Sequence, residues 1–441
     1  MEAIKIGLIG LGTVGTGTVA VLDRNASEIT RRAGRDIKVV QAAVKDMSKP
    51  RNCDLSSVEV VNDPFLVVNN PEIDVVVELI GGETLAKDLI LTAIANGKHV
   101  VTANKALIAL HGNEIFAAAQ EKSVIVAFEA AVAGGISIIK AIREGMAGNR
   151  IEWLAGIING TSNYILTELE QPGVNFSGVL KDAQDLGYAE ADPTFDIEGI
   201  DAAHKLTILA SIAYGIPLQF EAIYTEGITQ VTHEDVLNAK ELGYRIKHLG
   251  IARRNENGIE LRVHPTLVPS SRLLANVNGV MNAVVVKGDA VGSTLHYGPG
   301  AGSEPTASAV VADVVDVVRV ITADPHNRVP HLAFQPDALA EVPIVEMQKV
   351  ETAYYLRLQL QDKAGVLAEI TELLAEAKIN ISSLLQKGNA NERSDSQADN
   401  VTAVILTEPT VEGQFRSALK KIEALDSVVT NAVSFRVESL S

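Results

Sequence analysis

Two lysines stand where a side-chain ammonium group could take part in chemistry. Lys105 follows the apolar run 98–103 and Asn104. If that run is a strand of a parallel sheet, Lys105 lies at its carboxyl end, where open α/β sheets bind ligands. Lys205 lies four residues after Asp201, so both side chains share one helix face. A buried lysine has a lowered pKa and can exchange a proton; the alternatives are an exposed lysine and a surface ion pair.

Carboxylates are dense in the stretch that precedes Lys205. Such a cluster is either a solvated acidic loop or a site for the ammonium group of a substrate, and its position beside Lys205 favours the site. The carboxylates are those of Glu190, Asp192, Asp196, Glu198 and Asp201.

A G-x-G-x-x-G motif lies between the apolar run 4–10 and the helix-length stretch 13–32. Glycines at this spacing permit a tight turn and let backbone N–H groups approach a pyrophosphate. The position after a strand and before a helix predicts a dinucleotide site, with a ligand-free turn as the alternative. The motif residues are Gly10, Leu11, Gly12, Thr13, Val14 and Gly15.

The residues after the second predicted strand, 38–44, bear on the choice of dinucleotide. A cation there accommodates the 2′-phosphate of NADP, whereas a carboxylate binds the ribose of NAD. Lys45 follows the strand directly and Arg51 lies close behind. The sequence therefore favours NADP(H) over NAD(H), although Asp46 is adjacent and the alternative is a pair of solvated loop charges.

Apolar runs that alternate with helix-length stretches predict an α/β fold with three domains. In residues 1–130 the runs are separated by helices and read as strands buried on both faces, which predicts a Rossmann-like, doubly wound parallel sheet. Residues 131–322 predict an α+β domain for substrate binding and dimerisation. We expect the helix 300–325 to pack back on the first domain.

The C-terminal part has a different pattern. Residues 323–350 are rich in Pro and polar side chains, which predicts a linker. Residues 351–441 follow the order β-α-β-β-α-β, which predicts a ferredoxin-like module. The polar tract 388–400 within this module predicts a mobile hairpin loop.

Composition excludes several classes of protein. The 441 residues are 47% hydrophobic and 21% charged, as in globular chains. A formal net charge of −17 argues against nucleic acid and anionic membranes as partners. The single cysteine, Cys53, cannot form an internal disulfide, and no apolar run is long enough to span a membrane. Because the N-terminus also lacks the basic segment of a signal peptide, we expect a cytoplasmic protein.

The run from Ala183 to Lys205 resembles the signature of homoserine dehydrogenases over its whole length. Five further segments are similar to that family in the family's order, so the resemblance covers residues 1 to about 330. The tail is similar to an ACT module, and such modules often bind amino acids. The five segments are GLGTVG, VTANK, FEAAVAGGI, GIINGTSNYIL and GPGAG, and the tail matches at Asp362, Gly365, Val366, Leu367 and 379–381.

The resemblance implies reversible hydride transfer between a nicotinamide cofactor and L-aspartate 4-semialdehyde, giving L-homoserine for threonine, methionine and isoleucine biosynthesis. It implies that Lys205 exchanges the proton, that Lys105 holds substrate or shares this step, and that Asp201 positions the reacting groups. Because two ammonium groups would face one site, we expect each to lower the pKa of the other. The implied substrate-binding residues are Glu190, Asp196, Lys105, Gly160, Thr161 and Tyr188.

The resemblance also extends to ions, effectors and assembly. It implies a sodium or potassium ion on the loop 128–136, with a tight turn at a domain junction as the alternative. We hypothesise that threonine binds the ACT module and inhibits, which a deletion ending at Val350 would test, and we expect a homodimer or homotetramer. The implied cation ligands are Glu129, Val132, Gly134 and Ile136, and the further cofactor-binding residues are Gly81, Thr102, Lys105 and Gly302.

Two other functions stay open on sequence alone. A phosphorylating semialdehyde dehydrogenase also uses a dinucleotide fold but needs a cysteine nucleophile, and Cys53 lies in a polar loop. A non-catalytic sensor could bind a dinucleotide and an amino acid, but it would need no proton donor. The presence of Lys105, Lys205 and Glu190 argues against the sensor, and an assay for turnover separates the two.

Overall fold

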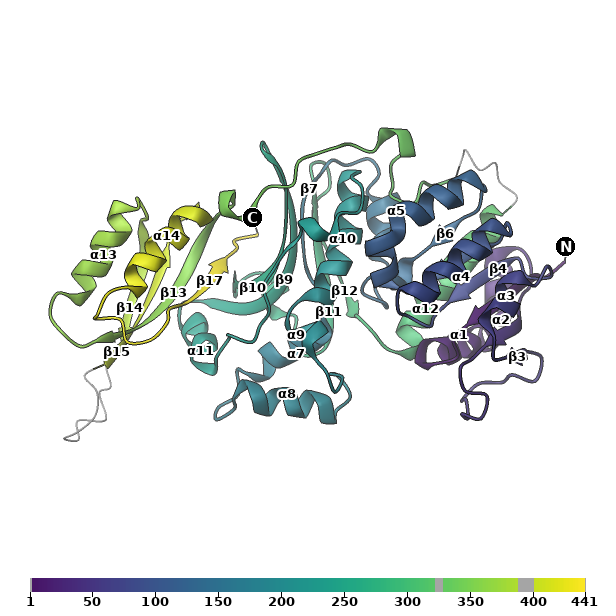
Figure 1. The fold of residues 1–441 in the computed structure, drawn as a ribbon, viewed down its shortest axis with the longest axis horizontal. Coiled ribbons are helices and arrows are strands. Elements are labelled where there is room, and N and C mark those ends of the chain that lie inside the picture. Colours follow the sequence, from purple (N-terminus) through teal and green to yellow (C-terminus); the bar gives the residue numbers. More distant parts are fainter. Residues whose placement is uncertain (1, 322–327, 388–399, 441) are drawn as a thin grey trace.

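The computed structural model describes residues 2–321, 328–387 and 400–440. Figure 1 shows an elongated molecule in which a central part separates the N-terminal part from the C-terminal part. No helix within these described ranges is long and apolar enough to cross a membrane.

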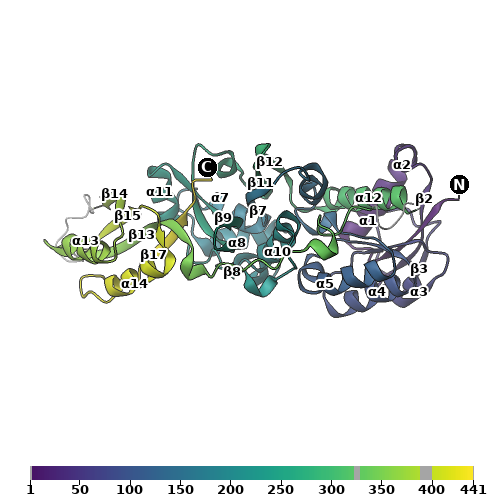
Figure 2. The same ribbon diagram turned by 90° about the horizontal axis from the view of Figure 1, so that it is seen from above.

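The N-terminal part is a six-stranded parallel sheet with helices on both faces. Helices α1, α2 and α12 cover one face, and α3, α4 and α5 cover the other, as Figure 2 shows. The order β3-β2-β1-β4-β5-β6 runs outward from β1 in both directions, which confirms the predicted doubly wound fold. The strands are β1 (Ile4–Ile9), β2 (Ile37–Ala43), β3 (Glu59–Val61), β4 (Val75–Glu78), β5 (His99–Thr102) and β6 (Val126–Ala127).

The helices of this part differ from prediction at one place. The single helix expected over 13–32 is wrong, because the chain breaks at Asn25, whose ψ of 15° departs from helical geometry. The helices are α1 (Thr13–Arg24), α2 (Ala26–Ala33), α3 (Pro64–Asn69), α4 (Thr84–Ala95) and α5 (Lys105–Glu121).

Helix α12 (Ser303–Val320) returns from the central part and packs on α1. Its Val310 and Val314 lie in one apolar cluster with Ile6 of β1. The crossing is close, since a side chain at Gly17 of α1 would lie 2.6 Å from Ser303 Oγ. The domain boundaries at 130, 322 and 350 stay predictions.

The central part contributes six strands to a second sheet. Helix α10 packs on this sheet through Leu206 and Leu209, which share a cluster with Ala252 and Val263 of the two longest central strands. The strands are β7 (Ile151–Ile157), β8 (Tyr224–Thr225), β9 (Tyr244–Asn255), β10 (Gly258–Pro269), β11 (Met281–Gly288) and β12 (Gly292–Pro299); the helices are α6 (Ile138–Lys140), α7 (Gly160–Glu168), α8 (Phe176–Asp185), α9 (Thr194–Ile197), α10 (Ile200–Tyr214) and α11 (His233–Glu241).

The C-terminal part has the predicted ferredoxin-like order. Its sheet runs β17-β13-β15-β14, with α13 and α14 packed on it. The short strand β16 (Thr410–Val411) pairs with β13, and the tract 388–399, expected as a mobile loop, lies outside the described residues. The elements are β13 (Glu351–Gln361), α13 (Val366–Glu376), β14 (Ile381–Lys387), β15 (Asn400–Thr407), α14 (Glu412–Glu423) and β17 (Val433–Val437).

The central and C-terminal sheets are continuous. Strand β17 pairs in parallel with β10, through Thr266 with Arg436 and Leu267 with Val437. The two parts therefore share one sheet of eleven strands. No pattern in the sequence predicts this pairing.

The predicted linker, where it is described, is a packed segment. The segment 328–350 contacts the N-terminal part and the central part. His331 stacks on Phe116 of α5 with ring centroids 4.8 Å apart, and Ile344 bridges Ile259 of β10. The segment is therefore held against the fold where it is described, and its assignment as a linker stays a prediction.

Candidate active site

The glycine motif forms the turn between β1 and α1. Gly10 has a φ of +102°, which favours glycine. A side chain at Gly15 would lie 2.0 Å from the Gly10 carbonyl oxygen, so α1 begins directly against the turn. The space beside Gly12 is open, and α1 has no side-chain cap. The uncapped helix N-terminus fits a pyrophosphate.

A cavity of about 1040 Å³ lies at the carboxyl ends of β1, β2 and β4. Lys45, Arg51 and Lys49 line it, and Lys49 was missed by sequence reasoning. Asp46 lines it as well, but its carboxylate accepts hydrogen bonds from the hydroxyl and N–H groups of Ser48, which lower its pKa. Among the predicted cofactor residues, Gly10, Leu11, Gly12, Lys45, Arg51 and Gly81 line the cavity, whereas Thr13, Val14, Gly15, Thr102, Lys105 and Gly302 do not.

A buried carboxylate organises the loop beside this cavity. Glu78, the last residue of β4, accepts hydrogen bonds from the Thr102 hydroxyl at 2.6 Å and from the N–H groups of Ile80 and Gly81 at 2.9 and 3.1 Å. Burial raises its pKa. Sequence reasoning missed Glu78, although a carboxylate that closes an apolar strand was an available signal.

Lys105 begins α5 beside the same loop. Asn104 caps α5 by accepting the N–H of Leu107 at 3.1 Å, and its amide donates to the Gly82 carbonyl oxygen at 2.6 Å. Gly82 lines the cavity, and the ammonium group of Lys105 contacts Asp201 of α10. Lys105 therefore stands between this cavity and the central part.

Asp201 lies between the two predicted lysines. Its Oδ2 is 2.6 Å from Lys205 Nζ, and its Oδ1 is 3.1 Å from Lys105 Nζ. Lys205 also donates to the Ile158 carbonyl oxygen at 2.7 Å. The side chain of Lys205 is 11% exposed and that of Lys105 is 38% exposed, so the cluster opens to solvent at Lys105. The helical pair is therefore buried, and it is not an ordinary surface ion pair.

The surrounding charges give the two lysines different pKa values. Burial and the charge of Lys105 together lower the pKa of Lys205 more than Asp201 raises it. Burial alone would raise the pKa of Asp201, but both ammonium groups hold it below its usual value. The pKa of Lys105 is nevertheless raised, because the charge of Asp201 outweighs its burial. Lys205 is the ammonium group of this pair that loses its proton more readily.

Asn159, which sequence reasoning did not single out, joins two carboxylates of the site. Its amide donates to Asp196 Oδ1 at 2.7 Å and to Asp201 Oδ2 at 2.8 Å. Its own oxygen accepts the N–H of Ser162 at 2.8 Å and caps α7. Burial raises the pKa of Asp196. The end of β7 therefore sets the spacing of both carboxylates.

The other residues of the acidic stretch lie nearer to solvent. Asp192 accepts hydrogen bonds from the hydroxyl and N–H of Thr194 at 2.6 and 3.1 Å and belongs to a turn. Glu190 and Glu198 are exposed, and the charge of Glu190 contributes to the raised pKa of Lys105. The stretch is thus partly a site and partly a solvated loop.

Among the predicted pocket residues, Thr161 holds the loop that carries Glu190. Gly160 begins α7, and the Thr161 hydroxyl donates to the Tyr188 carbonyl oxygen at 2.6 Å. The ring of Tyr188 is exposed and meets that of Tyr164 edge to face, with centroids 5.1 Å apart.

The predicted cation loop is buried. The Glu129 carboxylate accepts the N–H groups of Ile139 and Lys140 at 2.9 and 2.8 Å, and burial raises its pKa to about 7. A side chain at Gly134 would lie 3.1 Å from the Gly300 carbonyl oxygen, so the loop packs closely. In the described ranges no group of three or more His, Cys, Asp or Glu could hold a metal ion. The remaining predicted ligands, Val132 and Ile136, lie on the same loop.

Family models match all three parts of the chain. The model described as "Homoserine dehydrogenase, NAD binding domain" matches residues 10–129, the model "Homoserine dehydrogenase" matches 137–315, and "ACT domain" matches 354–426. The resemblance stated from the sequence is therefore confirmed, including the C-terminal module.

Relatives of this name are similar over the full length. The chain is 63% identical over 441 residues to homoserine dehydrogenase of Pseudomonas aeruginosa and 55% identical over 443 residues to that of Neisseria gonorrhoeae, with 100% of each chain covered. The crystal structure of a homoserine dehydrogenase from Thiobacillus denitrificans has a TM-score of 0.93 at 63% identity, covering 100% of this chain and 99% of that one.

A more distant structure is that of a hyperthermophilic archaeal homoserine dehydrogenase in complex with NADPH. It has a TM-score of 0.61 at 26% identity and covers 72% of this chain and 98% of its own. Because the two homoserine dehydrogenase models together match most of the chain and the relatives are similar over its full length, the chain belongs to the homoserine dehydrogenase family of oxidoreductases.

Proposed function

We propose that this site interconverts L-homoserine and L-aspartate 4-semialdehyde and that Lys205 exchanges the proton. The observation that carries this assignment is the Asp201 carboxylate, which bridges the ammonium groups of Lys105 and Lys205. This bridge lies between the central part and the cavity at the carboxyl ends of β1, β2 and β4. When bound, the nicotinamide dinucleotide supplies or accepts the hydride.

Lys205 has both the position and the charge state for proton transfer. Its ammonium group gives a proton to the aldehyde oxygen in reduction, and its neutral amine takes the hydroxyl proton in oxidation. Asp201 and the Ile158 carbonyl hold Nζ in place. Lys105 keeps its positive charge because its pKa is raised, and it stabilises the negative charge that develops on the same oxygen.

The carboxylates beside the lysines bind the amino-acid end of the substrate. Glu190 and Asp196 attract its ammonium group, and Asn159 holds Asp196 in place. Thr161, beside Gly160 at the start of α7, donates to the Tyr188 carbonyl oxygen and so holds the loop around this end.

We propose that NADP(H) is preferred over NAD(H). Lys45, Lys49 and Arg51 line the cavity, and the Asp46 carboxylate already accepts a hydrogen bond from the Ser48 hydroxyl. Cations in this position suit a 2′-phosphate. The archaeal relative, solved in complex with NADPH, supports the same choice.

We further propose a sodium or potassium ion at the loop 129–136. The Glu129 carboxylate is occupied by backbone N–H groups, so the ligands would be carbonyl oxygens of the loop, which such hard cations accept. Activity in sodium or potassium chloride, compared with a bulky ammonium salt at equal ionic strength, tests this site.

Two further proposals concern regulation and assembly. We propose that threonine inhibits through the ACT module and that the chain forms a homodimer or homotetramer. Initial rates with added threonine test the first statement, and light scattering of the purified chain tests the second.

The function is tested by homoserine-dependent reduction of NADP and NAD, followed by nicotinamide absorbance. Lys205→Ala is expected to lose about 10²–10⁴-fold in turnover and to bind dinucleotide normally. Lys181→Ala, at an exposed lysine of α8, is the matched control and should keep turnover. A wild-type chain that binds dinucleotide and threonine without turnover would instead be a sensor.

A further inference from the structure

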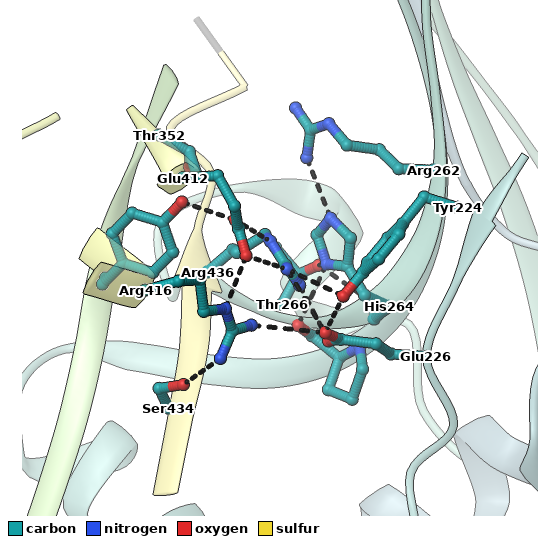
Figure 3. Close-up of polar contacts among 12 residues, drawn as sticks. Tyr224, Glu226, Arg262, His264, Thr266, Thr352, Glu412, Arg416, Ser434 and Arg436 are labelled. Atoms are coloured by element: carbon teal, nitrogen blue, oxygen red, sulfur yellow. Dashed lines mark hydrogen bonds and ion pairs between the residues drawn. The ribbon is translucent and has the colours of Figure 1, made fainter. Parts of the chain in front are cut away.

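A buried arginine of the ACT module reaches into the central part. Arg436 on β17 is 1% exposed. Its Nε and Nη2 donate to the two carboxylate oxygens of Glu412 on α14 at 2.8 and 2.7 Å, and its Nη1 donates to Glu226 Oε2 at 2.7 Å. Figure 3 shows the guanidinium between the two carboxylates. Because Glu412 belongs to the ACT module and Glu226 to the central part, one side chain joins both.

Glu226 is fixed from several directions. The Tyr224 hydroxyl and Arg416 Nη2 both donate to its Oε1, the latter at 3.3 Å. Its N–H donates to the Val263 carbonyl oxygen at 2.8 Å, and its own carbonyl oxygen accepts from His248 Nε2 at 3.0 Å. Glu226 is thereby anchored by its backbone to the central sheet and by its carboxylate to the ACT module.

The residues after Glu226 pack closely against the connection between α9 and α10. The Ile228 N–H donates to the Ile197 carbonyl oxygen at 2.8 Å, and a side chain at Gly227 would lie 2.5 Å from that same oxygen. On the other side, a side chain at Gly199 would lie 3.1 Å from His248 Cε1. Segment 197–199 is therefore in close contact with segment 226–228 and with His248, which is hydrogen-bonded to Glu226.

Segment 197–199 lies between two residues of the active site whose side chains are carboxylates. Asp196 precedes it directly, and Asp201 follows two residues after it. Both carboxylates share the Asn159 amide at 2.7 and 2.8 Å, and Asp201 holds both lysines. A misplacement of about 1 Å in a reacting constellation can cost about 10²-fold in rate.

We propose that Arg436 is a positioning residue of the active site. Through Glu226 it fixes segment 226–228, which in turn sets the position of Asp196 and Asp201. This inference rests on the proposed function, because it concerns the same site. It gives the ACT module a part in catalysis that needs no effector.

The test uses Arg436→Met and Glu226→Gln in the full-length chain. Each is expected to lower kcat/KM for homoserine about 10- to 100-fold and to raise KM, while the dissociation constant of NADP stays within about twofold. Arg436→Lys keeps the charge without the bidentate geometry, so it should recover part of the loss. Because both groups act through one link, the double variant should lose no more than the worse single variant.

Arg357→Met is the matched control. Arg357 also lies in the ACT module, and it crosses to the central part at Asp235, 2.6 Å away, and Glu234, 3.3 Å away. These partners lie at the start of α11, so the ion pairs of Arg357 go to Asp235 and Glu234 and not to Glu226. The control should lower the thermal midpoint and keep wild-type kinetic constants.

One outcome overturns the positioning role of Arg436, and a different outcome overturns the proposed function. If Arg436→Met and Glu226→Gln lower only the thermal midpoint, as Arg357→Met does, Arg436 merely joins the two parts and the inference fails. If Arg436→Met does not fold, the isosteric Glu226→Gln decides alone. If the wild-type chain shows no homoserine-dependent turnover, the proposed function itself fails.

Discussion

Replacement of Asp201 by asparagine tests the charge arrangement of the site most directly. The substitution keeps the size of the side chain but removes the negative charge that Lys105 and Lys205 share. The amide can accept from one ammonium group, while its NH2 group faces either the second ammonium group or the Asn159 amide. Burial of Lys205 is unchanged, so its pKa falls below that of the wild type, because the charge that raises it is gone.

The size of the effect follows from the two contacts. A hydrogen bond to a charged group contributes about 1.5–3 kcal/mol. Asp201 makes one contact at 2.6 Å to a buried lysine and one at 3.1 Å to a lysine that is 38% exposed, and solvent weakens the second. We therefore expect a loss of about 3–4 kcal/mol, which is a fall of about 10²–10³-fold in kcat/KM for homoserine.

The assay is homoserine oxidation between about pH 6 and pH 10. In this direction Lys205 must be neutral, so its lowered pKa should move the rising limb of the profile to lower pH in Asp201→Asn. Asp192→Asn is the matched control, since Asp192 belongs to the same stretch and contacts Thr194. If Asp201→Asn keeps kcat/KM within about threefold of wild type and the limb does not move, Asp201 does not set the state of Lys205.

Three further substitutions test other parts of the molecule. Arg51→Ala should lower the preference for NADP over NAD about tenfold, because it removes a cation from the cavity wall; steady-state kinetics with both dinucleotides measure the ratio, and an unchanged ratio contradicts the assignment. Glu78→Ala should weaken dinucleotide binding about tenfold, because the Gly81 loop loses the acceptor that holds it; a fluorescence titration with NADPH checks this. His331→Gln should flatten the loss of stability in acid. Burial lowers the pKa of His331 to about 4, so unfolding takes up a proton as the pH falls below about 6.5, and the free energy of unfolding drops. Thermal midpoints between about pH 7 and pH 4 report this slope, and equal slopes in both chains would refute it.

The parallel sheet and the glycine turn were predictable because their causes are local. Strands buried on both faces are apolar along their whole length, and β4, all of whose residues are buried, has this pattern except for its last residue. The turn at Gly10 requires a left-handed φ, which the motif itself indicates. The break at Asn25 was missed because residues on both sides of it favour helix.

The contacts that decide the chemistry join distant parts of the chain. The buried state of Lys205 depends on the Ile158 carbonyl, 47 residues earlier, and Asn159 reaches Asp201 across 42 residues. Composition and spacing near Lys205 fit a surface ion pair equally well. Resemblance to a family supplied the roles of the lysines, but the raised pKa of Lys105 emerged only from the position of Asp201 between them.

The continuous sheet also changes how regulation by the ACT module can be tested. A chain that ends at Val350 lacks β17, so the edge of β10 loses a partner strand and Glu226 loses Arg436. Such a chain should lose turnover whether or not the module binds threonine, and its lack of response to threonine would be uninformative. Asp362→Ala, in the exposed loop between β13 and α13, leaves that pairing intact. We expect it to keep turnover and to weaken inhibition by threonine; full inhibition in this variant would exclude Asp362 from the effector site.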